Sequence, residues 1–235
     1  VLGIESSSLV ASVALVTDDI LTGEYTANFK KTHSQTLLPM LDELAKLLEL
    51  DLNTVDAIAV AGGPGSFTGL RIGAATAKGL GLALKKPLIH VPTVDALAYN
   101  MWGASGLICP IMDARRNQVY AAFYMWENGK LIRLTDHMAE SIERVIEIAE
   151  MLEHEVIFLG DGVPVHRERL EQNPAFLFAP AHCNMQRASA VATLGAIMAE
   201  EGLAKPGNAF ELIYLRKSQA EREREARLAK EEAGE

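Results

Sequence analysis

Cysteine is scarce in this sequence, which has only Cys109 and Cys183 among its 235 residues. Two cysteines do not make a disulfide framework in a chain of this length, so we expect a reducing, cytoplasmic environment. Long hydrophobic runs are missing too, and no stretch approaches the ~20 apolar residues of a membrane-spanning helix. The first residues lack the basic and then apolar regions of a signal peptide. We therefore expect neither secretion nor a membrane partner.

Positive charge and histidine motifs are also in short supply. The chain has 22 Lys and Arg residues against 31 Asp and Glu residues, a net charge of −9. Because phosphate contacts need a cationic surface, we expect no tight binding of nucleic acid by this chain alone, which leaves open a role through a basic partner. None of the six His residues forms H-x-x-x-H or H-E-x-x-H, so no metal site of that kind is predicted.

What the sequence does contain is one order of strands and helices that occurs twice. Apolar residues run together or alternate where strands are expected, and recur every three or four residues where helices are expected. The first copy has predicted strands at 2–5, 10–17, 20–29, 55–61 and 88–91, and helices at 35–48, 67–86 and 94–101. The second has predicted strands at 107–112, 118–126, 130–135 and 156–159, and helices at 142–152, 165–171 and 187–201. We predict an α/β protein with one lobe at 1–104, a second at 105–215 and a charged tail at 216–235.

The two copies agree where chemistry is expected. The first strand of each ends in an acid, Glu5 or Asp113, and the strand after the first helix runs into a glycine-rich turn, at 62–65 or 160–162. Two such lobes facing each other would place both acids and both turns around one central cleft. The candidate nucleotide-binding residues of this cleft are Glu5, Ser6, Asp113 and Gly160.

The most informative stretch, GGPGSFTGLR at 62–71, joins a predicted buried strand to a helix. It lacks the spacing and the Gly-Lys-Ser/Thr of a Walker A loop, and it is neither a G-x-G-x-x-G fingerprint nor a G-x-S-x-G nucleophile elbow. Backbone N–H groups at a helix start can bind an anion, whereas glycines can equally serve a tight turn. The residues leave both interpretations open.

The helix after this stretch carries small residues at every fourth position, namely Gly69, Gly73, Ala77 and Gly81. A glycine inside a helix costs ~1 kcal/mol relative to alanine, so several of them need a compensating close contact. Packing on the chain's own sheet and a contact with another subunit are both typical of such a stripe. A second small face, Ala75, Gly79 and Ala83, would let one face meet the sheet and the other a partner, so we favour the subunit interface.

The run GGPGSFTGLRIG at 62–73 resembles the signature of the TsaB family, also called YeaZ. Three other segments are similar to that family and follow in the expected order, namely His33–Pro39, Asp113–Tyr120 and Tyr214–Arg216. The doubled pattern resembles the acetate kinase, Hsp70 and actin (ASKHA) superfamily. That resemblance implies an α/β fold of two ribonuclease-H-like βββαβα lobes.

The resemblance also implies a function. TsaB-type chains are non-catalytic partners of a TsaD-type paralogue in the complex that forms threonylcarbamoyladenosine in tRNA, with a TsaE-type ATPase joining them. It implies that this chain has no catalytic residue and no cofactor of its own, that the complex uses ATP, and that tRNA is reached only through the complex. A homodimer is implied when the chain is alone. The family contact uses the helices at 35–48 and 67–86, so the expected interface residues are Leu37, Leu41, Gly69, Gly73, Ala77 and Gly81.

One departure from the family bears on the alternatives. The first strand ends in Glu5-Ser6-Ser7, where the family usually has Asp-Thr, and the longer acid would displace a bound metal or phosphate. An independent ATPase or phosphotransferase, with Glu5 and Asp113 positioning a metal-bound phosphate, is the alternative to a scaffold. A protease would need a metal site or a nucleophile with its base, and the sequence has no signature of either.

Overall fold

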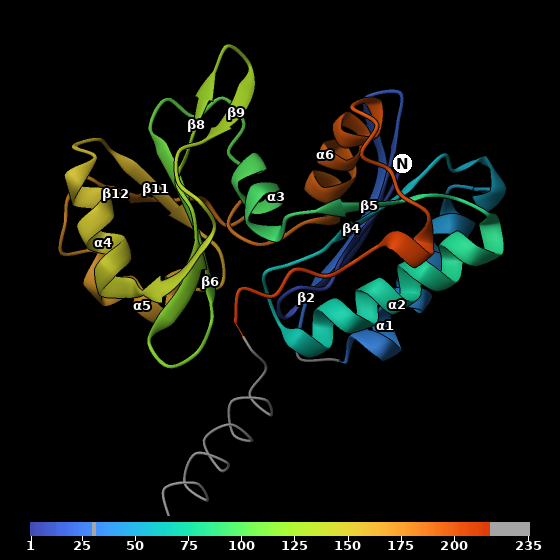
Figure 1. Cartoon of the computed structure of the whole chain (residues 1–235), viewed down its shortest axis with the longest axis horizontal. Helices are drawn as coiled ribbons and strands as arrows, with labels where there is room; N and C mark the ends of the chain where they lie inside the picture. The colour runs from blue at the N-terminus through green and yellow to red at the C-terminus, as the bar shows by residue number, and fades with distance from the viewer. Residues whose placement is uncertain (30–31, 217–235) are drawn as a thin grey trace, which may run out of the picture.

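The computed structural model describes residues 1–29 and 32–216, which form two lobes that each surround a mixed sheet (Figure 1). In the first sheet the strand order is β3-β2-β1-β4-β5. The first three strands are antiparallel and are joined by short turns, while β4 and β5 run parallel to β1. The strands are β1 (Leu2–Glu5), β2 (Val10–Thr17), β3 (Ile20–Asn28), β4 (Ile58–Ala61) and β5 (Leu88–Val91).

Two helices lie side by side on one face of this sheet, α1 (His33–Leu47) and α2 (Phe67–Leu84), as Figure 1 shows. A short 3₁₀ turn (Leu52–Thr54) follows α1. The apolar stripe of α1 points inward, because Leu37, Leu41 and Leu44 repeat every three or four residues and are buried against β1 and β2. Ser66 caps the start of α2, where its hydroxyl accepts a hydrogen bond from the Gly69 N–H.

The second sheet repeats the order of the first, as β10-β7-β6-β11-β12, with β8 and β9 as an added hairpin. Its parallel part is again β6 with the two strands that follow the first helix of the lobe. The predicted duplication of two ribonuclease-H-like lobes is confirmed. The elements are β6 (Leu107–Asp113), β7 (Gln118–Ala121), β8 (Tyr124–Glu127), β9 (Lys130–Arg133), β10 (Met138–Ser141), β11 (Val156–Leu159), β12 (Phe176–Phe178), α4 (Ile142–Met151) and α5 (Val163–Leu170).

The second lobe differs from the prediction in its strands. The long strand expected at 118–126 is two strands, β7 and β8, because the chain breaks its pairing with β6 at Ala122 and Phe123. There the Phe123 N–H bonds to the Thr135 hydroxyl at 3.0 Å instead of to a strand partner. The strands β10 and β12 were not predicted, since each has only three or four residues and neither alternates apolar with polar side chains.

The last helix, α6 (Ala188–Glu200), belongs to the first lobe and not to the lobe predicted at 105–215. It covers the face of the first sheet opposite α1 and α2 (Figure 1). Small residues allow this close packing, since a Cβ on Gly195 would collide with Ala59 of β4. Arg187, just before α6, forms an ion pair with Glu24 of β3, which ties the start of the helix to the same lobe. Residues 188–214 therefore pack with the first lobe, although the sequence placed them in the lobe at 105–215.

After α6 the chain runs along the first lobe as a terminal strap, residues 203–214, which includes a 3₁₀ turn (Gly207–Ala209). Lys205 pairs with Leu88 at the edge of β5, and the Ile213 N–H bonds to the Gly62 carbonyl at 2.9 Å. The short helix α3 (Thr93–Tyr99) lies between the lobes, packed on α6 and β6. Except for Arg216, the predicted charged tail lies outside the described residues. Within the described ranges, no helix is long and apolar enough to cross a bilayer.

Candidate functional site

Three carboxyl groups gather where the two lobes face each other. Glu5 ends β1, Asp113 ends β6, and Asp161 follows β11 in the glycine-rich turn of the second lobe. Asp161 links the other two electrostatically, because its charge acts on Glu5 and the charge of Asp113 acts on it. Both acids that the sequence placed between the lobes thus interact with a third, Asp161, which it did not name as a site residue.

Glu5 is fully buried at the end of β1. Its Oε1 accepts a hydrogen bond from the Ser7 N–H at 2.5 Å. Burial raises the pKa of Glu5 to about 7, and the nearby charge of Asp161 acts in the same direction. Near neutral pH this carboxyl is therefore protonated in much of the population.

Asp161 is half-buried, and its desolvation raises its pKa to about 6, helped by the charge of Asp113. Gln186 connects it to the first lobe. The Gln186 amide donates to Asp161 Oδ1 at 3.3 Å, while its carbonyl oxygen accepts from the Ser8 hydroxyl at 3.0 Å. This buried side chain bridges the two lobes across the cleft. Asp113 is held differently, because its Oδ1 accepts from the Arg115 N–H at 2.8 Å.

Ser6 follows Glu5 and is covered by the first turns of α2. Its hydroxyl donates to the Gly69 carbonyl at 2.9 Å, and a Cβ on Gly69 would collide with the Ser6 carbonyl. Next to it, the Ser66 N–H donates to the Ser7 carbonyl at 2.7 Å. The helix start and the loop after β1 therefore satisfy each other. The space and the hydrogen-bonding groups that a nucleotide phosphate would need at Ser6 are already used, so Ser6 does not fit that ligand.

The glycine-rich loop at 62–65 serves as a tight turn. Its Gly62 N–H donates to the Val91 carbonyl at 2.9 Å, and its Gly63 N–H donates to the Thr93 hydroxyl at 3.2 Å. Gly63 has a φ of +112°, which a side chain would strain. Of the two interpretations left open by the sequence, the structure supports the turn over the phosphate loop.

Gly160, the fourth candidate of the cleft, is also a packing residue. Its N–H donates to the Asn184 carbonyl at 2.7 Å, and its φ is +107°. A Cβ there would collide with the Ile111 carbonyl of β6. At Gly160 the structure shows a close approach between two backbone segments, and the nucleotide contact stays a prediction.

His33, which the sequence left unassigned, lies buried at the start of α1. Its Nε2 is 2.7 Å from the Ser8 carbonyl oxygen, which can only accept, so this nitrogen carries a proton. His33 thereby attaches α1 to the loop that follows β1. Among the described residues no group of three or more His, Cys, Asp or Glu side chains has the arrangement of a metal site.

The stripe expected at the subunit interface lies on the inner side of α2. Gly73 packs on Ser6, Ala77 belongs to the core of the first lobe, and a Cβ on Gly81 would come within 2.9 Å of Leu88. The other residues named with them, Leu37, Leu41 and Gly69, are buried in the same lobe. The chain's own sheet already occupies this side, so the structure offers no open surface at these six positions, and their part in a subunit contact stays a prediction.

The outer side of α2 carries the second small face. Ala75, Gly79 and Ala83 are exposed, and a Cβ on Gly79 would meet no atom within 4 Å. Leu82 is 83% exposed on this helix, and Leu47, near the end of α1, is 80% exposed. These five residues, which we call the outer helical face, leave an apolar and closely approachable surface. Periodicity alone could not say which small face of α2 would stay open.

Gln186 and Asp161 are the site residues that sequence reasoning missed. Asp161 had a usable signal, since it stands in a glycine-rich turn that matches the turn of the first lobe. Gln186 had none, because a lone glutamine ahead of a helix resembles any surface residue, and its burial depends on where α6 packs.

Comparisons with known proteins bear on most of the chain. Residues 23–223 match the model of the TsaD family, described as tRNA N6-adenosine threonylcarbamoyltransferase. The tRNA threonylcarbamoyladenosine biosynthesis protein TsaB of Bacillus subtilis is 34% identical over 171 residues, covering 73% of this chain and 75% of that protein.

Two solved structures from Pseudomonas aeruginosa have a similar fold. One is a protein described by its similarity to peptidase YeaZ, with a TM-score of 0.79 and 28% identity over 92% of this chain and 98% of that one. The other is YeaZ, with a TM-score of 0.76 and 26% identity over 91% and 98%.

Proposed function

This chain belongs to the TsaB family, and from that premise we propose that it is the non-catalytic partner of a TsaD-type transferase in the formation of threonylcarbamoyladenosine in tRNA. The curated relatives are named as biosynthesis proteins of this modified nucleoside. The proposal is that the chain holds the transferase in an active conformation and carries out no chemical step itself.

One observation carries the proposal: one side of α2 is packed against its own lobe, while the other side is exposed to solvent. The inner side fills the positions around Ser6 where a phosphate would bind, through the hydrogen bond from Ser6 to Gly69. The outer helical face stays open and offers small residues beside two exposed leucines. A helix of this kind suits close packing against a helix of another chain. We propose the outer helical face as the contact with the transferase.

The finer assignments follow from the same proposal. A TsaE-type ATPase is the expected third component, and ATP is used by the complex rather than by this chain. The same outer helical face would pair two copies of the chain when the transferase is missing. Work on tRNA would place the complex in the cytoplasm. The independent phosphotransferase is not favoured, because the buried Glu5 and the covered Ser6 leave a phosphate without its expected ligands.

A reconstituted modification assay tests the proposed function. Purified TsaD-type, TsaE-type and threonylcarbamoyl-adenylate-forming proteins are combined with tRNA, with and without this chain. We expect modified tRNA only when the chain is present, and no ATP hydrolysis by the chain alone. Modification without the chain, or ATP turnover by the isolated chain at a rate comparable with the complex, would contradict the proposal.

A further inference from the structure

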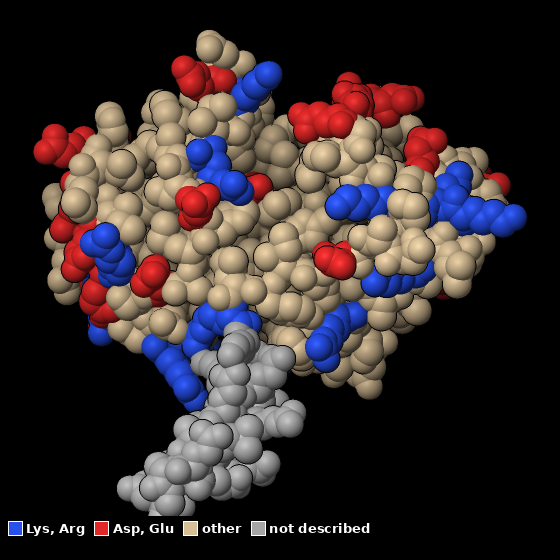
Figure 2. Space-filling view, viewed as in Figure 1, with Lys and Arg blue, Asp and Glu red and all other residues tan. Residues whose placement is uncertain are grey.

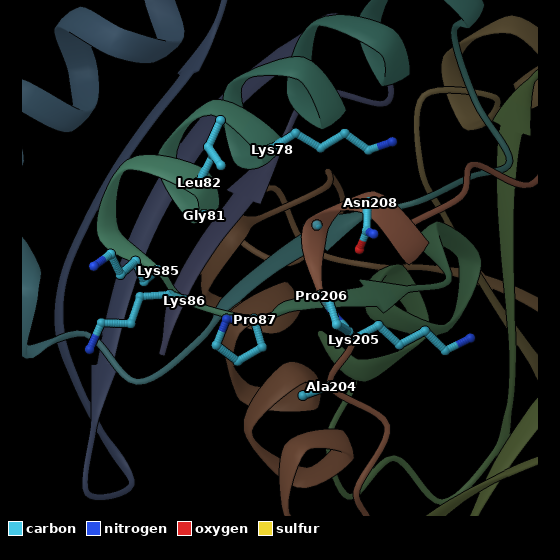
Figure 3. A pocket seen from close by; sticks show the side chains of 11 residues that line it. Lys78, Gly81, Leu82, Lys85, Lys86, Pro87, Ala204, Lys205, Pro206 and Asn208 are labelled. Carbon is cyan, nitrogen blue, oxygen red and sulfur yellow. The ribbon is translucent and has the colours of Figure 1, made fainter.

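A groove runs along the flank of α2 that faces the terminal strap (Figure 3). Its first hollow has a volume of about 770 Å³, and the apolar part of its lining includes Gly81, Leu82, Pro87 and Pro206. Beyond Lys78 it continues into a second hollow of about 530 Å³, between α2 and the end of the strap. The groove lies away from the acids between the lobes and borders the outer helical face at Ala75 and Leu82.

Basic side chains line this groove in a chain whose net charge is −9. They are Arg71, Lys78, Lys85, Lys86 and Lys205. Figure 2 shows Lys and Arg side chains over α2 and the strap, while acidic side chains gather along the upper edge of the same lobe. Two acids lie nearby, since Glu211 lines the second hollow and Asp51 interacts with Lys86. The positive charge still outweighs them.

The order of the cations along α2 is regular. Arg71 and Lys78 are seven residues apart in α2, which places them on one flank with a step of about 10 Å, and Lys85 follows directly after the helix, so the three backbone positions span about 21 Å. Lys205 stands on the opposite wall, and Figure 3 shows it extending in the same direction as Lys78, with Asn208 between them. Figure 3 shows Lys85 and Lys86 extending to the other side, so Lys78 and Lys205 are the two cations that extend together from opposite walls.

Several contacts hold this arrangement in place. The Arg71 guanidinium lies 3.8 Å from the centre of the Phe67 ring, and its Nε is 3.4 Å from the Tyr214 hydroxyl. The Lys78 ammonium is 5.8 Å from the centre of the Phe210 ring. The backbone of Lys205 is fixed by two hydrogen bonds to Leu88, of 2.7 and 2.8 Å. The groove is thus built before any ligand arrives.

Only some of these basic side chains have a role in stabilising the fold. Lys85 follows the last turn of α2, where a cation interacts favourably with the helix dipole. Lys78 and Lys205 have no such reason, and within the described ranges neither forms an ion pair with an acidic side chain. Their charges remain available to a ligand.

We propose that this groove binds the phosphate backbone of RNA. Lysine binds phosphate as a point charge, and four of the five cations are lysines, so the groove complements a row of negative charges. A span of about 21 Å also exceeds a single nucleotide and suits a chain of phosphates. Given the proposed function, the RNA is a tRNA, and only this identification rests on that function.

The test uses the full chain, both alone and bound to a TsaD-type transferase, and measures the dissociation constant for labelled tRNA over a range of salt. The variant is Lys78→Ala/Lys205→Ala. We expect tRNA binding to weaken about tenfold near 0.1 M salt, and the slope of log affinity against log salt to become shallower by about 2. The control Lys130→Ala/Arg144→Ala removes the same charge from β9 and α4 and should bind like the unchanged chain.

Gel filtration of the chain with the transferase separates the two proposals. If the unchanged chain forms no complex with the transferase, the proposed function is contradicted. The tRNA dissociation constant of the chain alone still tests the groove in that case. If both double variants bind tRNA equally well, the groove is not an RNA site. Tighter binding of poly-glutamate than of tRNA, lost in Lys78→Ala/Lys205→Ala, would overturn the proposal in favour of an acidic polypeptide.

Discussion

Helix α2 has two sides made of the same small residue types at the same spacing, and they meet different surroundings. On the inner side, Gly69 and Gly73 let the helix lie directly on Ser6, and no atom can be added there. On the outer side, Gly79 has open space around it. Glycine serves close packing in the first case and leaves a surface open to approach in the second.

The difference teaches that a small-residue stripe marks close contact without saying with what. The inner contact covers Ser6 with the first turns of α2 and leaves no room for a further group there. The outer helical face and the basic groove beside it are the parts of α2 that other molecules can reach. The following variants separate these sides, in order of the expected effect on stability.

The largest effect is expected on the inner side, for Gly73→Leu. A side chain there would collide with the Ser6 hydroxyl, and the helix would have to move away from β1. We expect a loss of about 3 kcal/mol or more in the free energy of unfolding, measured by urea denaturation. An unchanged midpoint would show that the inner side is not closely packed.

The next effect concerns the acid that this packing buries. Glu5 has a pKa of about 7 in the folded chain against 4.5 for an ordinary Glu, so the unfolded chain loses its proton first as pH rises. The stability it contributes is complete below pH 4.5 and is lost as pH rises through about 7.

Glu5→Gln should therefore remove this decline and stabilise the protein at pH 8 by about 2–3 kcal/mol. Denaturation curves at pH 4.5, 6 and 8 measure it, with tRNA modification left nearly unchanged if the chain is a scaffold. Asp161→Asn is the matched control, with its effect confined mainly to the range between 3.8 and about 6. If the stability of Glu5→Gln depends on pH as strongly as that of the unchanged chain, the raised pKa of Glu5 is contradicted.

On the outer side, Gly79→Leu should stabilise the isolated chain by about 0.5–1 kcal/mol, because leucine is the better helix former and meets no atom. The same side chain should block close approach and abolish binding to the TsaD-type transferase, measured by gel filtration. Gly79→Ala gains similar helix stability with one methyl group and should retain binding. If Gly79→Leu binds as well as Gly79→Ala, the outer helical face is not the contact.

The smallest effect is expected at the end of α2, for Lys85→Gly. Lys85 has a φ of +54°, a conformation that glycine adopts without strain. We expect the free energy of unfolding, measured by thermal denaturation, to rise by about 0.5 kcal/mol, because the relief of backbone strain exceeds the lost interaction with the helix dipole. A concurrent loss of tRNA affinity would show that the open flank keeps its lysine at some expense of stability.

Periodicity predicted most individual elements, and it failed where tertiary contacts decide. The first three strands and the helices α1 and α2 were foreseen because their apolar patterns are long and regular. The strands β10 and β12 were missed because three or four residues carry no period. The cleft acids Glu5 and Asp113 were found from their places at strand ends, whereas the bridging role of Gln186 depends on residues far along the chain.

By itself, the sequence determined the doubled α/β order, the acids at the ends of the first strands, and the family. These features depend on local patterns and on motifs that stand in one stretch of chain. Only the tertiary structure decided that α6 returns to the first sheet, that the inner stripe of α2 is buried, and that Lys78 faces Lys205 across a groove. These features depend on which surfaces pack together. The identity of an apolar or basic residue does not indicate whether it will contact its own sheet, solvent or a partner.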